Sequence, residues 1–409
     1  MDWDDTPQQA AFRAEVRTFL RERLPARYRE QAAEIGGEGE RGWQADRASE
    51  DPAARAAARE WGEALSSRGW FAPHWPQEYG GAGLTTMEQF VFSQEMAALG
   101  APLASNTQSI GLLGPTLIVH GSEEQRAEHL PRILSGEVVW AQGYSEPGAG
   151  SDLAAVQTRA VRDGDEYVVN GQKIWTTGAH TADWLFALVR TDPSAPKHRG
   201  ISFLLLDIKS PGISIRPLID AAWEHRINET FFEDVRVPVR NRLGEENRGW
   251  YVAVTLLDFE RSAISGAVGL RRALTQLLEY VYSDRGRAPS RLEALPTLRA
   301  EVADRFIEIE VTFNLSLRIA SMQSRGLIPN YEASMGKLFS SETGHCLWRT
   351  GTRVFGLYAN LWDAEDARSP LRAFFTRTYV SSIPSTIGGG SSEIQRNIIA
   401  TRGLGLPRA

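Results

Sequence analysis

Cysteine, histidine and long apolar runs are scarce in this sequence of 409 residues. The lone cysteine, Cys346, excludes an internal disulfide framework and a cysteine-based metal site. The seven histidines form no HExxH or His-x-His pattern, which argues against a metal hydrolase, and we predict no metal site. The longest apolar runs, such as residues 250–257, are far too short to cross a bilayer.

A basic excess is also missing, because 45 lysines and arginines face 51 aspartates and glutamates, a net charge of −6. This balance argues against nucleic acid as the main partner. The first residues are acidic and contain no apolar segment of the kind that a secretory signal needs, so we expect a cytoplasmic protein. The hydrophobic content of 42% indicates a folded chain, and the length predicts two or three domains.

The spacing of apolar residues changes twice along the chain. Residues 1–137 have helical spacing, with capped helix starts at Thr6 and Ser122. Residues 138–244 alternate with a period of two, and residues 245–409 return to helical spacing, with long amphipathic stretches at Leu292–Ile319 and Tyr331–Trp348. We therefore expect an N-terminal helical domain (1–137), a central β domain (138–244) and a C-terminal helical domain (245–409).

Several local features refine this division. Residues 31–58 are rich in Gly, Ala and charge, and we predict a polar insertion or mobile loop, with helical spacing resuming at Arg59. Asn170-Gly171 predicts a tight hairpin turn, and Asp163-Gly164 a weaker turn of the same kind. Strands are predicted at Asp183–Arg190, Ile201–Ile208 and Thr230–Val235.

A glycine-rich segment, QGYSEPGAGSD, runs from Gln142 to Asp152 at the predicted end of a strand. Glycines let backbone N–H groups approach an anion or a flat ring with no Cβ in the way. A structural turn has the same composition, so this segment alone does not establish a ligand site.

A second segment, NGQKIWTT, runs from Asn170 to Thr177. On alternating strand positions, Trp175 and Thr177 point to the same face. An indole and a hydroxyl on one face suit a planar ligand, which they would hold by stacking and a hydrogen bond. A core tryptophan would give the same pattern.

Together these two segments resemble the flavin-binding segments of the acyl-CoA dehydrogenases. Residues 232–238 (FEDVRVP) and 387–400 (IGGGSSEIQRNIIA) are similar to two further motifs of that family, the second being its C-terminal signature. Four spaced motifs are far more specific than any one of them. The resemblance covers nearly the whole chain and implies an N-terminal helical domain, a central β-barrel and a C-terminal four-helix bundle.

The resemblance also implies an activity. Members bind FAD and oxidise an acyl-CoA thioester to the trans-2-enoyl-CoA: a base removes the α-proton, the β-hydrogen leaves as hydride to the flavin, and electrons pass to an electron-transfer flavoprotein. Carried over by resemblance, the FAD contacts are Gln142, Tyr144, Ser145, Gly150, Ser151, Trp175, Thr177, Arg285, Arg353, Gly356, Ser391 and Glu393. The substrate contacts are Ser151, Asp258 and Arg261, although the last two are spaced to form a helical ion pair instead.

The catalytic base departs from the commonest family pattern. Gly389 stands where many members carry a glutamate, and it keeps only the backbone N–H that the family directs at the thioester carbonyl. In the isovaleryl and long-chain members the base lies on the first long helix of the bundle, where this chain has Glu260. Its helical neighbours, Leu256, Leu257, Ala263 and Ile264, are apolar, and burial among them would raise its pKa towards that of a base at neutral pH. A structural pairing of Glu260 with Arg261 or with another helix is the alternative.

Two further departures concern the family's FAD contacts across subunits. Arg285 is kept, but the Phe-Gly pair that follows it in the family is Ala288-Pro289, and a Gln-x-x-Gly-Gly segment becomes Arg353–Leu357. These changes resemble the bacterial branch of paired dehydrogenases for steroid side chains. We therefore expect a homotetramer or homodimer, or a heterotetramer with a related subunit. A catalytically deficient partner subunit, and a flavin oxidase or monooxygenase acting without CoA, are the alternative functions.

Overall fold

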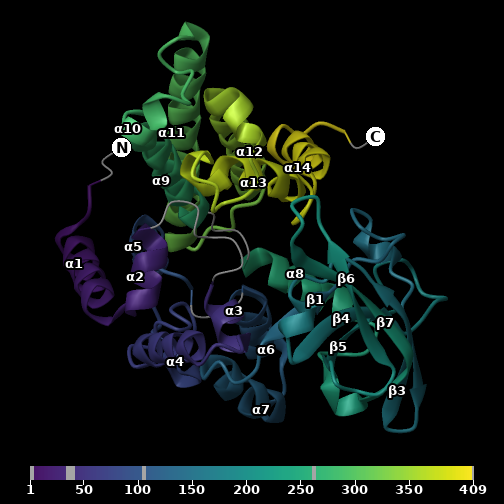
Figure 1. The fold of residues 1–409 in the computed structure, drawn as a ribbon. Coiled ribbons are helices and arrows are strands. Elements are labelled where there is room, and N and C mark those ends of the chain that lie inside the picture. The colour runs from purple at the N-terminus through teal and green to yellow at the C-terminus, as the bar shows by residue number, and fades with distance from the viewer. Residues whose placement is uncertain (1–3, 34–41, 104–106, 260–263, 408–409) are drawn as a thin grey trace. The chain divides into compact units, whose positions relative to one another are not determined.

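The computed structural model describes residues 4–33, 42–103, 107–259 and 264–407 (Figure 1). By its internal contacts the chain divides into two compact units that do not follow the order of the sequence. The helical unit comprises Met1–Gly42, Leu84–Pro102 and Arg261–Ala409, and the sheet unit comprises Trp43–Gly83 and Leu103–Glu260. No helix among the described residues is both long and apolar enough to span a bilayer.

The helical unit is built around two long helices, α11 (Pro296–Ser324) and α12 (Tyr331–Phe355), which pack on each other and on α9 (Ile264–Val281). Its core holds fully buried Leu277, Ile309 and Leu347. The other helices of this unit are α1 (Pro7–Arg23), α2 (Ala26–Ala33), α5 (Thr86–Leu99), α10 (Asp284–Arg287), α13 (Phe374–Ser381) and α14 (Ser392–Ile398). The predicted capping box at Thr6 is confirmed at the start of α1.

The sheet unit contains one eight-stranded sheet, visible in Figure 1, in the order β6-β7-β3-β2-β4-β5-β8, with β1 pairing in parallel with β4. The strands are β1 (Trp140–Gly143), β2 (Arg159–Asp163), β3 (Glu166–Lys173), β4 (Trp184–Arg190), β5 (Ile201–Asp207), β6 (Ile213–Ile219), β7 (His225–Pro238) and β8 (Arg242–Leu243). The strands predicted near 183–190, 201–208 and 230–235 are confirmed as β4, β5 and part of β7. The only helical segments between these strands are short 3₁₀ turns, so the central β domain is confirmed.

The prediction of a loop over residues 31–58 is wrong for much of its length. Trp43–Ala48 forms α3 and Pro52–Ser66 forms α4, so helical structure begins before Arg59. Ala54, Ala58 and Trp61 are buried on one face of α4, because alanine at helical spacing packs closely although it is only weakly apolar. The indole Nε1 of Trp43 donates to Ala58 O at 2.8 Å. Residues 34–41 of this stretch lie outside the described residues.

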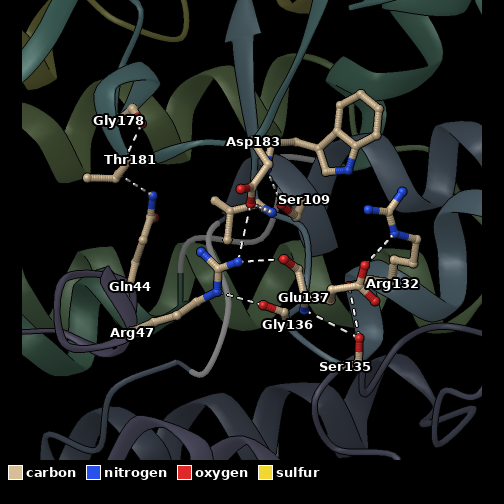
Figure 2. Close-up of polar contacts among 12 residues, drawn as sticks. Gln44, Arg47, Ser109, Arg132, Ser135, Gly136, Glu137, Gly178, Thr181 and Asp183 are labelled. Carbon is tan, nitrogen blue, oxygen red and sulfur yellow. Dashed lines mark hydrogen bonds and ion pairs between the residues drawn. The ribbon is translucent and has the colours of Figure 1, made fainter. Parts of the chain in front are cut away.

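The remaining helices of the sheet unit are α6 (Gly114–His120), α7 (Glu123–Leu134), whose capped start at Ser122 is confirmed, and α8 (Gly249–Phe259). Figure 2 shows how Arg47 attaches α3 to the sheet: its guanidinium donates to Gly136 O and Glu137 O, each at 2.6 Å, and pairs with Asp183 at 3.2 Å. The Asp183 carboxylate also accepts from Val139 N at 2.9 Å. The residues predicted as a mobile loop therefore brace the start of β1.

The predicted hairpin turn at Asn170-Gly171 is also wrong. Strand β3 runs through both residues, and the tight turn is the weaker candidate, at 163–166 between β2 and β3. Instead, the pairing of β3 with β7 is irregular between Val169 and Gly171, where Asn170 faces two residues of β7, Glu233 and Asp234, so the extra residue of the bulge lies in β7. Gly171 has φ at 149°, and a Cβ there would lie 2.7 Å from Thr158 Cα. The Asn170 side chain exchanges two 2.9 Å hydrogen bonds with Asp234 of β7, which stabilises the bulge.

Candidate functional site

The predicted site residues fall into two groups, one in each unit. In the sheet unit, Gln142 lies at the end of β1 and Tyr144 is buried, edge-on to Phe186. The chain then turns sharply, because Glu146 and Ala149 exchange two backbone hydrogen bonds of 3.0 Å. Gly150 and Ser151 are exposed beyond this turn. A Cβ added at Gly148 or Gly150 would meet nothing within 4 Å, so the chain leaves open space at both glycines.

The two flavin-like segments lie next to each other. Ile174 N donates to Ser145 O at 2.9 Å, which joins the start of the glycine-rich loop to the residue before Trp175. Trp175 is 58% exposed, Thr176, which follows it, is buried, and Thr177 is exposed again. The prediction that Trp175 and Thr177 occupy alternating strand positions is wrong, because β3 ends at Lys173; both residues are exposed.

Trp175 has an unusual backbone conformation, with φ at +62°. A residue other than glycine in this left-handed region costs about 1–2 kcal/mol. The strain persists because its neighbours are fixed: Thr176 N donates to Asn228 O at 3.0 Å, and Asn228 Nδ2 donates to Thr176 O at 2.9 Å. Such strain is found at ligand clamps, where the surrounding structure holds an exposed side chain in place.

Beneath the loop lies an ion pair that the sequence analysis gave no role. Lys173 is completely buried, and its ammonium donates to Glu146 Oε1 at 2.7 Å, to Leu188 O at 2.6 Å and to Tyr144 O at 3.2 Å. Its three donors therefore all have acceptors. The alternation of β3 offered a signal, because Tyr167, Val169 and Lys173 share the buried row and a charge in that row needs a partner.

Burial and charge act on this pair in opposite directions. Burial lowers the pKa of Lys173 to about 8, against the attraction of Glu146. Burial raises the pKa of Glu146, but the charge of Lys173 and hydrogen bonds from Lys173, Thr158 and Gln157 outweigh it, so this pKa lies below its ordinary value. Both groups are therefore charged at neutral pH.

In the helical unit, the predicted residues Gly389, Ser391 and Glu393 lie at the start of α14. Gly389 and Gly390 have φ values of 67° and 91°, which favour glycine. The loop is fixed from its carbonyl side, because Lys337 Nζ donates to Gly390 O at 2.7 Å and Gln395 Nε2 to Gly389 O at 3.0 Å. The Ser391 hydroxyl caps α14. Gly389 and Glu393 are exposed.

The other predicted cofactor contacts of this unit lie on or beside α10 and α12. Arg285 is exposed in α10. Arg353, near the end of α12, is half exposed and forms an ion pair with Glu301 of α11, which also accepts from the Thr350 hydroxyl at 2.7 Å. Gly356 ends α12 with φ at 56°, where a Cβ would meet the Arg291 side chain at 2.7 Å. Glu260 and Arg261 lie outside the described residues, and for Asp258 only the helical backbone of α8 is described.

Models of one family match the chain in three consecutive stretches. The N-terminal domain of acyl-CoA dehydrogenases matches residues 6–137, the middle domain matches 141–235, and the C-terminal domain matches 247–404. The chain belongs to the acyl-CoA dehydrogenase family. It is therefore an oxidoreductase, and its fold is that of the acyl-CoA dehydrogenases, with N-terminal helical, central β and C-terminal helical domains. The predicted boundaries at 137 and 244 remain predictions.

Individual acyl-CoA dehydrogenases are similar over the full length. Acyl-CoA dehydrogenase FadE26 of Mycobacterium tuberculosis is 36% identical over 99% of this chain and 98% of its own. The solved structure of the Tcur3481-Tcur3483 steroid ACAD matches with a TM-score of 0.82 and 34% identity, over 100% of both chains. The ChsE4-ChsE5 complex of Mycobacterium tuberculosis matches with a TM-score of 0.81 and 35% identity, also over 100% of both chains.

Proposed function

We propose that this acyl-CoA dehydrogenase binds FAD and oxidises an acyl-CoA thioester to the trans-2-enoyl-CoA, with electrons passing to an electron-transfer flavoprotein. The observation that carries the proposal is the 2.9 Å hydrogen bond from Ile174 N to Ser145 O, which brings the glycine-rich loop beside exposed Trp175. The residues fit the cofactor: an exposed indole suits a flat ring system, and Ser151 and Thr177 supply exposed hydroxyls. The open space at Gly148 and Gly150 leaves room for a ligand against the backbone.

The proposal assigns separate sets of residues to the binding of FAD and of the acyl-CoA. The proposed FAD contacts in the sheet unit are Gln142, Tyr144, Ser145, Gly150, Ser151, Trp175 and Thr177. Those in the helical unit are Arg285, Arg353, Gly356, Ser391 and Glu393. Arg285 makes its contact across a subunit interface. When bound, FAD supplies an acceptor for the hydride that leaves the β-carbon. Ser151, Asp258 and Arg261 bind the acyl-CoA.

The proton chemistry belongs to Glu260 and Gly389. The Glu260 carboxylate takes the α-proton of the thioester. The backbone N–H of Gly389 donates to the thioester carbonyl and stabilises the negative charge that builds on its oxygen. The left-handed φ of 67° keeps a glycine at 389, and a glutamate there would be strained, which supports Glu260 as the base.

A second candidate function is that of a subunit that works with a related chain. The ChsE4-ChsE5 complex and the Tcur3481-Tcur3483 steroid ACAD each pair two named components. In this chain Arg353 is engaged with Glu301 of its own fold, and Gly389 lacks the commonest base. A heterotetramer with a related subunit would then complete the flavin site.

One experiment separates the candidates. The chain is purified alone, its flavin spectrum is recorded, and anaerobic bleaching is followed with a panel of straight-chain, branched and steroid-side-chain acyl-CoA esters. Bound flavin that bleaches supports the dehydrogenase acting by itself. A chain without flavin that gains it only with a related subunit supports the second candidate. Flavin that no ester bleaches, but that oxygen-coupled substrates without CoA reduce, would refute both.

A further inference from the structure

The buried ion pair of Lys173 and Glu146 joins the two flavin-like segments of the sheet unit. Lys173 ends β3 two residues before Trp175, and its ammonium binds Tyr144 O and Glu146 Oε1 at the start of the glycine-rich loop. Its third acceptor, Leu188 O, lies in β4, the strand that pairs with β1. One side chain thus fixes the loop relative to two strands.

The Glu146 carboxylate fixes the other end of the same loop. Its two oxygens accept from Gln157 N at 2.6 Å and from Thr158 N at 2.9 Å, where the chain enters β2. Residues 147–156 are therefore closed into a loop whose two ends meet at a single carboxylate. This carboxylate is 8% exposed, and Lys173 is not exposed at all.

We propose that Lys173 and Glu146 are a positioning pair, which holds the glycine-rich loop against the Trp175 segment in the arrangement that receives the flavin. This inference rests on the proposed function. Neither side chain touches the cofactor in this proposal, because both lie beneath the surface that Trp175 and Ser151 present. They act through the backbone of residues 144–146, 157–158 and 173–175.

A charge pair suits this role better than apolar packing would. A buried ion pair adds little net stability over well-packed apolar side chains of similar volume, but each of its hydrogen bonds has a direction. The three acceptors of Lys173 come from β4 and from the loop, and only a cation at their centre fixes all of them. An apolar replacement can therefore restore the fold while leaving the loop free to shift.

The test compares three variants with the parent: Lys173→Met, Glu146→Gln and the double variant. Apoprotein is titrated with FAD, and the dissociation constant, the visible flavin spectrum and the melting temperature of the apoprotein are measured. Loss of a charge-assisted hydrogen bond corresponds to an about 10- to 100-fold change in an equilibrium. We expect FAD affinity to fall by about that factor in Lys173→Met, with an altered flavin spectrum. The double variant regains melting temperature but not FAD affinity.

Tyr167→Phe is the matched control on the same strand. Tyr167 is buried at the opposite end of β3, and its hydroxyl contacts Glu246 at 2.9 Å and Arg242 at 2.8 Å. Its loss should lower the melting temperature and leave FAD affinity and the flavin spectrum unchanged. Hydrogen exchange of the apoprotein gives a readout without cofactor: the amides of Gln157 and Thr158 should lose protection in Glu146→Gln and keep it in Tyr167→Phe.

The possible outcomes distinguish a failure of this inference from a failure of the proposed function. A parent chain that binds no FAD under any condition overturns the proposed function, and this inference with it. A parent that binds FAD, beside a Lys173→Met variant of equal affinity and unchanged spectrum, overturns the inference alone. The inference is also overturned if Tyr167→Phe loses as much FAD affinity per degree of lowered melting temperature as Lys173→Met does. The Lys173–Glu146 pair would then act on FAD only through the general stability of the fold. If Lys173→Met does not fold, the double variant and Glu146→Gln decide by the same criteria.

Discussion

Two glycine-rich segments of this acyl-CoA dehydrogenase, residues 145–152 and 387–391, look alike in sequence and differ in construction. Gly389 and Gly390 adopt left-handed φ values, and a Cβ at Gly390 would lie 2.5 Å from Gln395 Nε2. Gly148 and Gly150 show neither constraint, since neither has such a φ and an added Cβ would meet open space. The fold itself requires glycine at 389 and 390, whereas no contact among the described residues requires glycine at 148 or 150.

The largest expected effect is on the rate of flavin reduction, and it follows from a change at Glu260. This residue is proposed to react with the substrate, whereas the two glycine-rich segments are compared for cofactor binding and stability. Glu260→Gln should reduce the rate of flavin reduction by about 100- to 10,000-fold, the usual contribution of a positioned base. FAD content should not change. Rapid mixing with an ester that bleaches the parent measures the rate. A rate within a few-fold of the parent would show that the base lies elsewhere.

Trp175 lies beside the first segment, and its substitution tests whether it serves ligand binding or the stability of the fold. Trp175→Gly removes both the proposed stacking surface and a left-handed backbone strain of about 1–2 kcal/mol. We expect FAD affinity to fall by about tenfold or more while the melting temperature of the apoprotein is unchanged or raised. Titration with FAD and thermal denaturation measure the two quantities. If both fell together, Trp175 would be a structural residue of the sheet unit.

The two classes of glycine can be compared directly. Gly390→Ala should destabilise the helical unit by about 1–2 kcal/mol, because alanine is strained at a φ of 91° and meets the Gln395 side chain. Gly150→Ala should leave the unfolding transition of the apoprotein unchanged but weaken FAD binding. Chemical denaturation and FAD titration on both variants give the comparison. If Gly390→Ala and Gly150→Ala lowered the free energy of unfolding equally, the fold would require glycine at both positions and the two segments would not differ in this respect.

The smallest effect concerns acid stability. The pKa of Glu146 is lowered in the folded chain, so its contribution to stability is fully present above the unfolded value of 4.5 and is lost as pH falls through the folded pKa. Glu146→Gln should therefore flatten the loss of stability below pH 4.5. Glu393, beside the second loop, also has a lowered pKa, caused by its own backbone N–H and the Ser391 hydroxyl, but it is exposed.

Because solvent screens an exposed carboxylate, Glu393→Gln should change the acid profile far less than Glu146→Gln does. Thermal denaturation of both variants between pH 3 and 7, about the range in which carboxylates titrate, provides the measurement. If the melting temperatures of the two variants changed with pH in the same way, the burial of Glu146 against Lys173 would have no effect on acid stability.

Local signals predicted much of the fold. The capping boxes at Thr6 and Ser122 depend on residues three apart and are confirmed. The strands β4 and β5 are confirmed for the same reason, since short apolar runs bounded by Gly, Pro, Asn and Asp are a property of consecutive residues; both strands are buried along nearly their whole length. Among the site residues, the resemblance grouped the two flavin-like segments, but their adjacency through the hydrogen bond from Ile174 N to Ser145 O is known only from the structure.

The sequence by itself thus determined the succession of helical, β and helical regions, the family and the two glycine-rich segments, because each is a property of residues close together in the sequence. Only the tertiary structure decided that Asn170-Gly171 lies within β3 opposite a bulge in β7, and that Lys173 is buried against Glu146. The bulge depends on Asp234, 64 residues from Asn170, and the ion pair joins residues 27 apart. The free energy of such choices comes from partners distant in sequence, which local propensity does not contain.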